Sequence, residues 1–305
     1  MSKLYDALRR MEMERGQSRS RSIPLAESLG DLIAGAVEVS EPTSSTIRAT
    51  PSCQLVASTD PKSLGAERFR ALATRLENLR RQSEFKALQV TSATVNEGKT
   101  LVAGNLAVTL ARQSGLKVLL VEGDLHRPTL ASLFGLAHLR GLSHWWLEKE
   151  EELESFIHRL DDMPLYFLSA GATYDQPSQI LRSSRFGEAW MKLASRFDWV
   201  IVDSTPMSPV IDAHLWSRLV ETILLVVREG VTPIKSLKKG LATLDNPTLA
   251  GIVLNDASEF DHLSYGQYYA TGENGNHKER PTFSKSLHHL EKARAWLMAE
   301  LRKSK

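Results

Sequence analysis

The sequence predicts an α/β fold in which a mainly parallel sheet is covered by helices on both faces. Two observations support this prediction. Strand-like and helix-like segments alternate over most of the chain, which is the pattern of strand–helix–strand units. Strand-like segments such as 118–121 and 223–227 consist only of apolar residues, and strands that are apolar on both faces are typical of parallel sheets buried between helical layers.

The alternating segments define the expected elements in order. A helix over 67–81 comes first, because Phe69, Leu72, Leu76 and Leu79 lie on one stripe of it. Strands are then expected near 86–92, 117–122, 164–168, 199–203, 222–228 and 249–255, and helices near 99–113, 129–135, 184–196, 211–219 and 234–244.

The chain is expected to divide into three parts. Residues 1–59 combine a short helix with a flexible linker, and little fixed structure is expected over 24–58, where Ser, Thr and Pro are frequent. Residues 60–256 form the folded domain. Residues 257–305 hold a polar, tyrosine-containing tail and a closing amphipathic helix near 284–303.

Composition excludes several classes of protein. The 305 residues carry a formal net charge of +2, which gives no basis for a nucleic-acid partner. The single cysteine, Cys53, excludes an internal disulfide framework and a cysteine-based metal site. No apolar run reaches the ~18 residues needed to cross a bilayer. We therefore expect a cytoplasmic protein.

The segment Leu88–Thr100 has the layout of a nucleotide-phosphate loop. An apolar strand ends in a polar loop that closes with Gly98, Lys99 and Thr100, and a helix follows. Such a loop points backbone N–H groups at phosphates, and the helix adds its positive end. Lys99 would neutralise phosphate charge and the Thr100 hydroxyl would bind Mg²⁺. The pattern departs from G-x-x-x-x-G-K-[ST] at its first glycine, where this chain has Ala93.

Carboxylates follow two of the later strands. Glu122 and Asp124 come at the end of one strand, and Asp203 ends another. Because ligands of an open parallel sheet bind at the carboxyl ends of its strands, these side chains are expected in one crevice with the phosphate loop. A metal–triphosphate needs this set of groups: carboxylates for Mg²⁺, a cation for the phosphates and a base for the acceptor. ATP and Mg²⁺ are the expected cofactors.

Over about 60–256 the sequence resembles the bacterial tyrosine kinases (BY-kinases) of exopolysaccharide and capsule biosynthesis, the cytoplasmic autokinases of the chain-length-determinant system. Two segments, 168–171 and 176–181, separate this family from the partitioning and septum-site ATPases that share its three-layer P-loop NTPase fold. The segments that carry the resemblance are Glu67-Arg-Phe-Arg-Ala-Leu72, Asn96-Glu-Gly-Lys-Thr100, Glu122-Gly-Asp-Leu-His-Arg-Pro128, Leu168-Ser-Ala-Gly171, Gln176-Pro-Ser-Gln-Ile-Leu181, Asp198-Trp-Val-Ile-Val-Asp203 with Thr205-Pro206, and Leu249-Ala-Gly-Ile-Val-Leu-Asn255.

The resemblance implies an ATP-dependent protein-tyrosine autokinase that phosphorylates its own tail. It further implies a homo-oligomer, and a membrane-spanning chain-length-determinant (polysaccharide co-polymerase) partner that recruits the kinase to the inner face of the cell membrane. Polymerisation and export of exopolysaccharide or capsule would be regulated in this way. The implied catalytic residues are Lys99, Glu122, Asp124 and Asp203; the nucleotide-binding residues Asn96, Glu97, Gly98, Lys99, Thr100, Leu101 and Asn255; the metal ligands Thr100, Asp124 and Asp203; and the phosphoacceptors Tyr265, Tyr268 and Tyr269.

Four positions depart from the family pattern. Glu122 stands where the family has Asp, His126 where Arg is usual, Asn96 where a loop glycine is usual, and Ala73 at the last place of a Glu/Arg/Arg helix pattern linked to ring assembly. Two other functions therefore stay open. One is a kinase-inactive ATP-binding switch or scaffold subunit of the polysaccharide export machinery. The other is a positioning ATPase that cycles on a membrane through its last helix.

Overall fold

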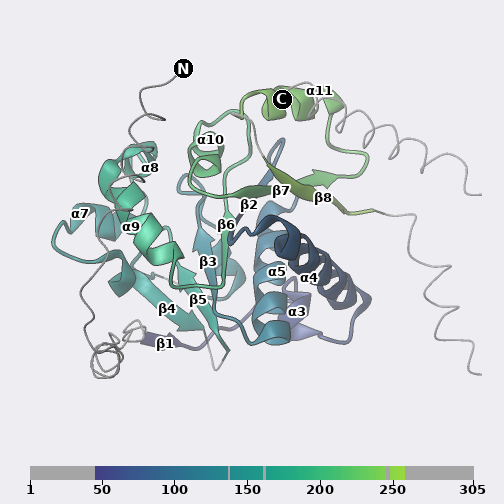
Figure 1. Cartoon of the computed structure of the whole chain (residues 1–305), viewed down its shortest axis with the longest axis horizontal. Helices are drawn as coiled ribbons and strands as arrows, with labels where there is room; N and C mark the ends of the chain where they lie inside the picture. The colour runs from purple at the N-terminus through teal and green to yellow at the C-terminus, as the bar shows by residue number, and fades with distance from the viewer. Residues whose placement is uncertain (1–44, 137, 161–162, 245–247, 258–305) are drawn as a thin grey trace, which may run out of the picture. The chain divides into compact units, whose positions relative to one another are not determined.

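The computed structural model describes residues 45–136, 138–160, 163–244 and 248–257 (Figure 1). The expected short N-terminal helix, the tyrosine-containing tail and the closing helix lie outside the described residues. All strands and helices below belong to the described ranges.

The centre of the fold is an eight-stranded sheet with the order β1-β4-β5-β3-β6-β2-β7-β8. Each pair of neighbouring strands is parallel except β4 and β5, which run antiparallel. The predicted mainly parallel sheet is therefore confirmed. The strands are β1 (Ser45–Ile47), β2 (Ala87–Ser92), β3 (Val118–Glu122), β4 (Ile157–Leu160), β5 (Leu165–Leu168), β6 (Trp199–Asp203), β7 (Thr222–Arg228) and β8 (Leu249–Asn255).

Helices connect these strands, and their starts follow from capping residues in two of the longer cases. The Ser63 hydroxyl accepts a hydrogen bond from Ala66 N, and the Ser183 hydroxyl accepts one from Phe186 N. None of the described helices is long and apolar enough to span a bilayer. The helices are α3 (Val56–Thr59), α4 (Leu64–Ser83), α5 (Lys99–Ser114), α6 (Leu130–Leu133), α7 (Leu142–Leu147), the 3₁₀ helix η1 (Leu153–Phe156), α8 (Ser178–Arg182), α9 (Ser184–Ala194), α10 (Asp212–Ser217) and α11 (Ile234–Ala242).

The sheet separates two main hydrophobic cores, because successive side chains of a strand point to opposite faces. In β3, Val118 and Leu120 pack in the core beneath α3, α4, α5 and α6, whereas Leu119 and Val121 pack in the core beneath α7, α8, α9 and α10. Figure 1 shows α4 and α5 on one side of the strands and α8 and α9 on the other. The result is a helix–sheet–helix sandwich, as the doubly apolar strands predict.

The folded domain includes residues ahead of its expected start at position 60. Strand β1 pairs in parallel with β4, and the Leu55 side chain is fully buried in the core beside α5. The buried side chain of Asn105 also holds this segment, accepting a hydrogen bond from Ala57 N at 2.9 Å and donating one to Gln54 O at 3.0 Å. Little fixed structure was expected over 24–58 because Ser, Thr and Pro are frequent there. In the structure, Leu55 and Ala57 are nevertheless buried, and a polar side chain of α5 satisfies backbone groups of this segment.

We predict that Leu55→Ala lowers the free energy of unfolding by about 2–5 kcal/mol, because it removes a fully buried side chain and leaves a cavity. Chemical denaturation of the full chain measures this change. Leu147→Ala is the matched control, since Leu147 is 64% exposed and its truncation should change stability by less than about 0.5 kcal/mol. Equal effects of the two substitutions would contradict the inclusion of residues 45–59 in the domain.

Candidate active site

The loop that follows β2 has a backbone that turns sharply before α5. Asn96 has a φ of 62° and Gly98 a φ of 94°, so both lie in the left-handed region. Asparagine tolerates this region better than most residues, which explains how the loop forms without the usual glycine at position 96. Helix α5 then begins at Lys99, and Thr100 and Leu101 belong to its first turn. The loop and the helix start thus have the arrangement of a phosphate cradle.

The side chain of Glu97 is buried inside this loop. One carboxylate oxygen accepts a hydrogen bond from Ala93 N at 3.1 Å, and the other accepts from Thr94 N at 3.2 Å and from the Thr94 hydroxyl at 2.5 Å. Glu97 is fully buried. Its carboxylate therefore holds the start of the loop in shape. A contact between Glu97 and a nucleotide stays a prediction.

Lys99 lies between two carboxylates from neighbouring strands. Its ammonium nitrogen is 3.0 Å from Asp124 Oδ2 and 3.9 Å from Asp203 Oδ1, and it is 3.3 Å from the Thr100 hydroxyl. The strand order β3-β6-β2 creates this cluster, because it aligns the ends of the three strands that deliver these residues. The structure thus brings together the predicted residues Lys99, Thr100, Asp124 and Asp203.

The pKa of Asp203 differs from the ordinary value of an aspartate. Burial raises the pKa of its carboxyl to about 7, against the lowering effects of the Lys99 ammonium and the Thr100 hydroxyl and with smaller raising effects from Asp124 and Glu122. No described residue donates a hydrogen bond with acceptable distance and angles to either carboxylate oxygen. A buried carboxylate without donors is costly unless a cation satisfies it.

These groups fit a magnesium ion. Mg²⁺ binds proteins through one or two carboxylates and completes its octahedral shell with water and substrate phosphates. Asp203 supplies two oxygens that accept no hydrogen bond from the described part of the chain, and the Thr100 hydroxyl and Asp124 lie beside Lys99, the lysine that also faces Asp203. Within the described ranges there is no group of three or more His, Cys, Asp or Glu side chains that could hold a metal ion.

Glu122 is buried and bound to protein donors at both oxygens. Oε1 accepts from Ala131 N in α6 at 3.0 Å, and Oε2 accepts from the Ser169 hydroxyl and from Ala170 N at 3.1 Å each. These contacts link the end of β3 to the loop after β5 and to the start of α6. Three of the roughly four lone-pair sites of the carboxylate are thus occupied. The family resemblance implies a catalytic role for Glu122, which stays a prediction. Its hydrogen bonds show that the side chain also holds α6 and the loop after β5 in place.

The loop after β3 is held by residues that sequence reasoning did not assign to the site. Asp212 at the start of α10 is fully buried; its Oδ1 accepts from the Ser178 hydroxyl at 2.6 Å, and its Oδ2 lies 3.1 Å from His126 Nε2. Asp124, two residues before His126, accepts a hydrogen bond from Arg127 N at 3.0 Å. Ser178 lies in the segment 176–181, which carries part of the family resemblance. That resemblance was the feature of the sequence that could have indicated this group of contacts.

Asn255, at the end of β8, reaches the phosphate loop. Its Nδ2 donates a hydrogen bond to Glu97 O at 2.9 Å. A methyl group placed on Gly98 would lie only 2.1 Å from Asn255 Nδ2, so the amide fills the space beside this glycine. The structure therefore brings Asn255 to the nucleotide loop. The expected phosphoacceptors Tyr265, Tyr268 and Tyr269 lie outside the described residues.

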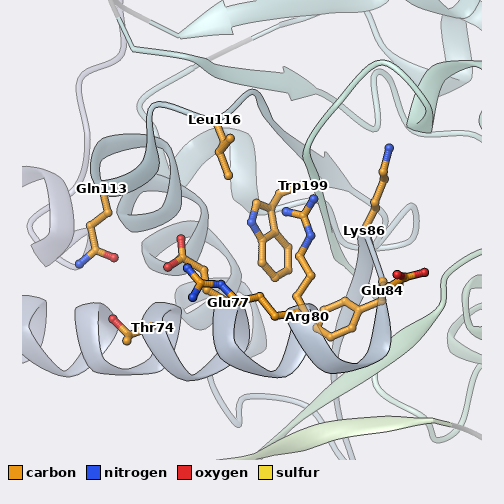
Figure 2. A pocket seen from close by; sticks show the side chains of 10 residues that line it. Thr74, Glu77, Arg80, Glu84, Lys86, Gln113, Leu116 and Trp199 are labelled. Atoms are coloured by element: carbon orange, nitrogen blue, oxygen red, sulfur yellow. The ribbon is translucent and has the colours of Figure 1, made fainter.

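A separate cavity of about 970 Å³ lies at the other end of β6 (Figure 2). Trp199 begins β6 at this cavity, whereas Asp203 ends the strand at the charge cluster. The Arg80 guanidinium lies 4.9 Å from the centre of the Trp199 ring. None of the lining residues belongs to the expected nucleotide site, so this cavity is not the nucleotide crevice. They are Thr74, Glu77, Arg80, Arg81, Glu84, Phe85, Lys86, Gln113, Leu116 and Trp199.

Known proteins with similar sequences are tyrosine kinases. Tyrosine-protein kinase YwqD of Bacillus subtilis (strain 168) is 33% identical over 223 residues, which are 72% of this chain and 92% of YwqD. Putative tyrosine-protein kinase CapB of Staphylococcus aureus is 32% identical over 213 residues, which are 68% of this chain and 92% of CapB. The sequence matches no family model.

Solved structures give the same result. The kinase domain of the Escherichia coli tyrosine kinase ETK superimposes with a TM-score of 0.61 at 29% identity, over 83% of this chain and 97% of that domain. The chimerical protein CapA2B2 superimposes with a TM-score of 0.63 at 28% identity, over 70% of this chain and 93% of the chimera. Two relatives above 30% identity are thus matched over nearly their whole length, and kinase-domain structures share the arrangement of the sheet and helices. The chain therefore belongs to the family of bacterial tyrosine-protein kinases.

Proposed function

We propose that this protein is an ATP-dependent autokinase that transfers phosphate from ATP to tyrosines of its own tail. The observation that supports this most strongly is the cluster of Lys99, Asp124 and Asp203 beside a shaped phosphate loop. A phosphoryl transfer needs positioning and charge neutralisation more than covalent chemistry. Tyr265, Tyr268 and Tyr269 follow β8 within 14 residues of its end at Asn255, and β8 contacts the loop through Asn255.

The chain's own residues would divide the work as follows. Lys99 would leave its carboxylate partners and neutralise the β- and γ-phosphates. Asp203, Asp124 and Thr100 would hold Mg²⁺, which when bound spreads and neutralises the charge of the migrating phosphoryl group. The N–H groups of the loop and of the first turn of α5 would orient the phosphates. A carboxylate of the cluster would accept the proton of the tyrosine hydroxyl.

The proposed homo-oligomer rests on residues of α4. Arg70 donates from Nε to Glu67 Oε2 at 2.9 Å, and both side chains are partly exposed. Ala73 is fully buried, so position 73 faces the core and presents nothing to a neighbouring copy. Self-association through the Glu/Arg/Arg pattern would therefore depend on Glu67 and Arg70 alone in this chain.

We further infer a role in exopolysaccharide or capsule polymerisation and export, together with a membrane-spanning chain-length-determinant partner. The support is the resemblance over 60–256 and the membership of the kinase family. In this role the protein would be cytoplasmic and would meet the inner face of the cell membrane through that partner.

A specific observation supports the alternative of a kinase-inactive nucleotide switch. Glu122 would serve as the acceptor base only at the expense of hydrogen bonds to Ala131, Ser169 and Ala170. The same bonds would let Glu122 transmit the state of the crevice to α6 and to the loop after β5 without any transfer. The two functions differ in whether phosphotyrosine forms.

Intact-mass measurement and phosphotyrosine mapping after incubation with ATP and Mg²⁺ test the autokinase. We expect added phosphate on Tyr265, Tyr268 or Tyr269, and a rate reduced by at least about 100-fold in Lys99→Met, because the transition-state charge then lacks its cation. The Tyr265→Phe/Tyr268→Phe/Tyr269→Phe variant controls for phosphate elsewhere. ATP binding without phosphotyrosine would reject the autokinase and favour the switch.

Glu122→Asp separates bracing from base catalysis. The shorter side chain cannot keep all three hydrogen bonds, so we expect the free energy of unfolding to fall by about 1–3 kcal/mol and the rate of autophosphorylation not to rise. Denaturation and a phosphorylation time course measure the two quantities on the same preparation. A faster reaction at unchanged stability would instead identify residue 122 as the base, with aspartate as the better one.

Asp203 predicts a distinctive pH dependence of stability in the nucleotide-free protein. Its folded pKa of about 7 lies above its unfolded value, so protonation of Asp203 stabilises the folded protein. This stabilisation is fully present below the unfolded pKa and is lost as the pH rises to about 7. Asp203→Asn lacks this loss. Its stability relative to wild type should therefore increase by about 2–3 kcal/mol between pH 5 and pH 8, measured by urea unfolding. A difference that is the same at both pH values would contradict this assignment.

A further inference from the structure

Without any nucleotide, the side chain of Asn255 already makes a hydrogen bond within the protein. It stands at the last residue of β8, where the main chain is anchored by a hydrogen bond from Glu229 N to Asn255 O at 3.0 Å. The next residue, Asp256, is held by Arg228, whose Nη2 lies 2.7 Å from Asp256 Oδ2. From this fixed position Nδ2 donates to Glu97 O at 2.9 Å.

The peptide that accepts this hydrogen bond joins Glu97 to Gly98 in the phosphate loop. In a trans peptide the carbonyl and the N–H point in opposite directions. Because the Glu97 carbonyl points to Asn255, the N–H of Gly98 must point away from β8. A glycine with a φ of 94° has little steric resistance to a peptide flip, so some other group has to fix this orientation. Asn255 is placed to do so.

Two further contacts restrain the loop around this peptide. The Glu97 carboxylate accepts hydrogen bonds from Ala93 N and Thr94 N on the upstream side of the loop. The Asn255 amide also packs against Gly98 so closely that a side chain there would collide with it at 2.1 Å. The loop is therefore clamped upstream by a carboxylate and downstream by an amide from another strand.

We propose that Asn255 is a positioning residue that locks the Glu97–Gly98 peptide, keeping the Gly98 N–H directed away from β8 as a donor for the phosphates. This rests on the proposed nucleotide function and replaces the direct nucleotide contact that the resemblance implies for this residue. Asn255 then acts on every ligand that carries the phosphate chain, whether or not the ligand carries a base.

The test compares the binding of two ligands by calorimetry: a non-hydrolysable ATP analogue with Mg²⁺, and inorganic tripolyphosphate with Mg²⁺. Asn255→Ala should raise the Kd of both by the same factor, about 3–10-fold, the effect of one lost hydrogen bond. Asn255→Asp should raise both further, because a carboxylate repels the Glu97 carbonyl and attracts the Gly98 N–H, which favours the flipped peptide. Ile252→Val is the matched control, because Ile252 lies on the same strand and is 40% exposed; both Kd values should stay at wild-type level.

Two results would overturn the proposal. A Kd that rises for the ATP analogue while that of tripolyphosphate is unchanged would make Asn255 a reader of the base. Unchanged Kd values for both ligands, or a lowered melting temperature without a change in Kd, would leave Asn255 with a role in folding only. Failure of the wild type to bind either ligand is a different result, because it would reject the proposed nucleotide function itself.

Discussion

The ion pair between Lys99 Nζ and Asp124 Oδ2, 3.0 Å long, is the interaction on which the rest of the site depends. It connects the first residue of α5 to the loop after β3, across the end of β6 where Asp203 lies. A lysine this deep in a protein needs a carboxylate partner, and a buried carboxylate needs a cation. The parallel order β3-β6-β2 meets both needs by bringing three strand ends together. The same geometry prepares the lysine and the carboxylates for a metal–triphosphate, since the ligand brings charges of both signs.

The surrounding acidic residues divide into those that hold loops and those free to meet a ligand. Glu97 holds the phosphate loop, Glu122 holds α6 and the loop after β5, and Asp212 holds α8 and approaches the loop that carries Asp124. Each accepts hydrogen bonds from protein groups. Asp203 differs, because burial leaves its oxygens without donors of full geometry and raises its pKa. A buried carboxylate that lacks hydrogen-bond donors gains most when a cation arrives, so binding of Mg²⁺ would offset the cost of burying Asp203.

Much of the fold could be predicted from the sequence, because strands that are apolar on both faces, such as 118–121, are buried on both faces and therefore indicate a parallel sheet. Two elements of the described fold, β1 and α3, were not predicted from the sequence. Strand β1 and helix α3 span only three and four residues, and they are held by edge pairing and by Asn105 of α5, contacts that no local periodicity records. At the site, the motif identified Lys99 and Thr100 because loop, lysine and hydroxyl are contiguous in sequence. The direction of the Glu97 and Glu122 side chains could not be predicted, because it depends on partners 3 to 48 residues away.

A crystal structure with Mg²⁺ and a non-hydrolysable ATP analogue tests the central claim most directly. The account predicts that Lys99 moves from Asp124 to the phosphates, that an oxygen of Asp203 and the Thr100 hydroxyl lie in or next to the magnesium shell, and that Asn255 keeps its hydrogen bond to Glu97 O. A nucleotide bound away from this loop would contradict the account, as would a metal held without Asp203 and Thr100.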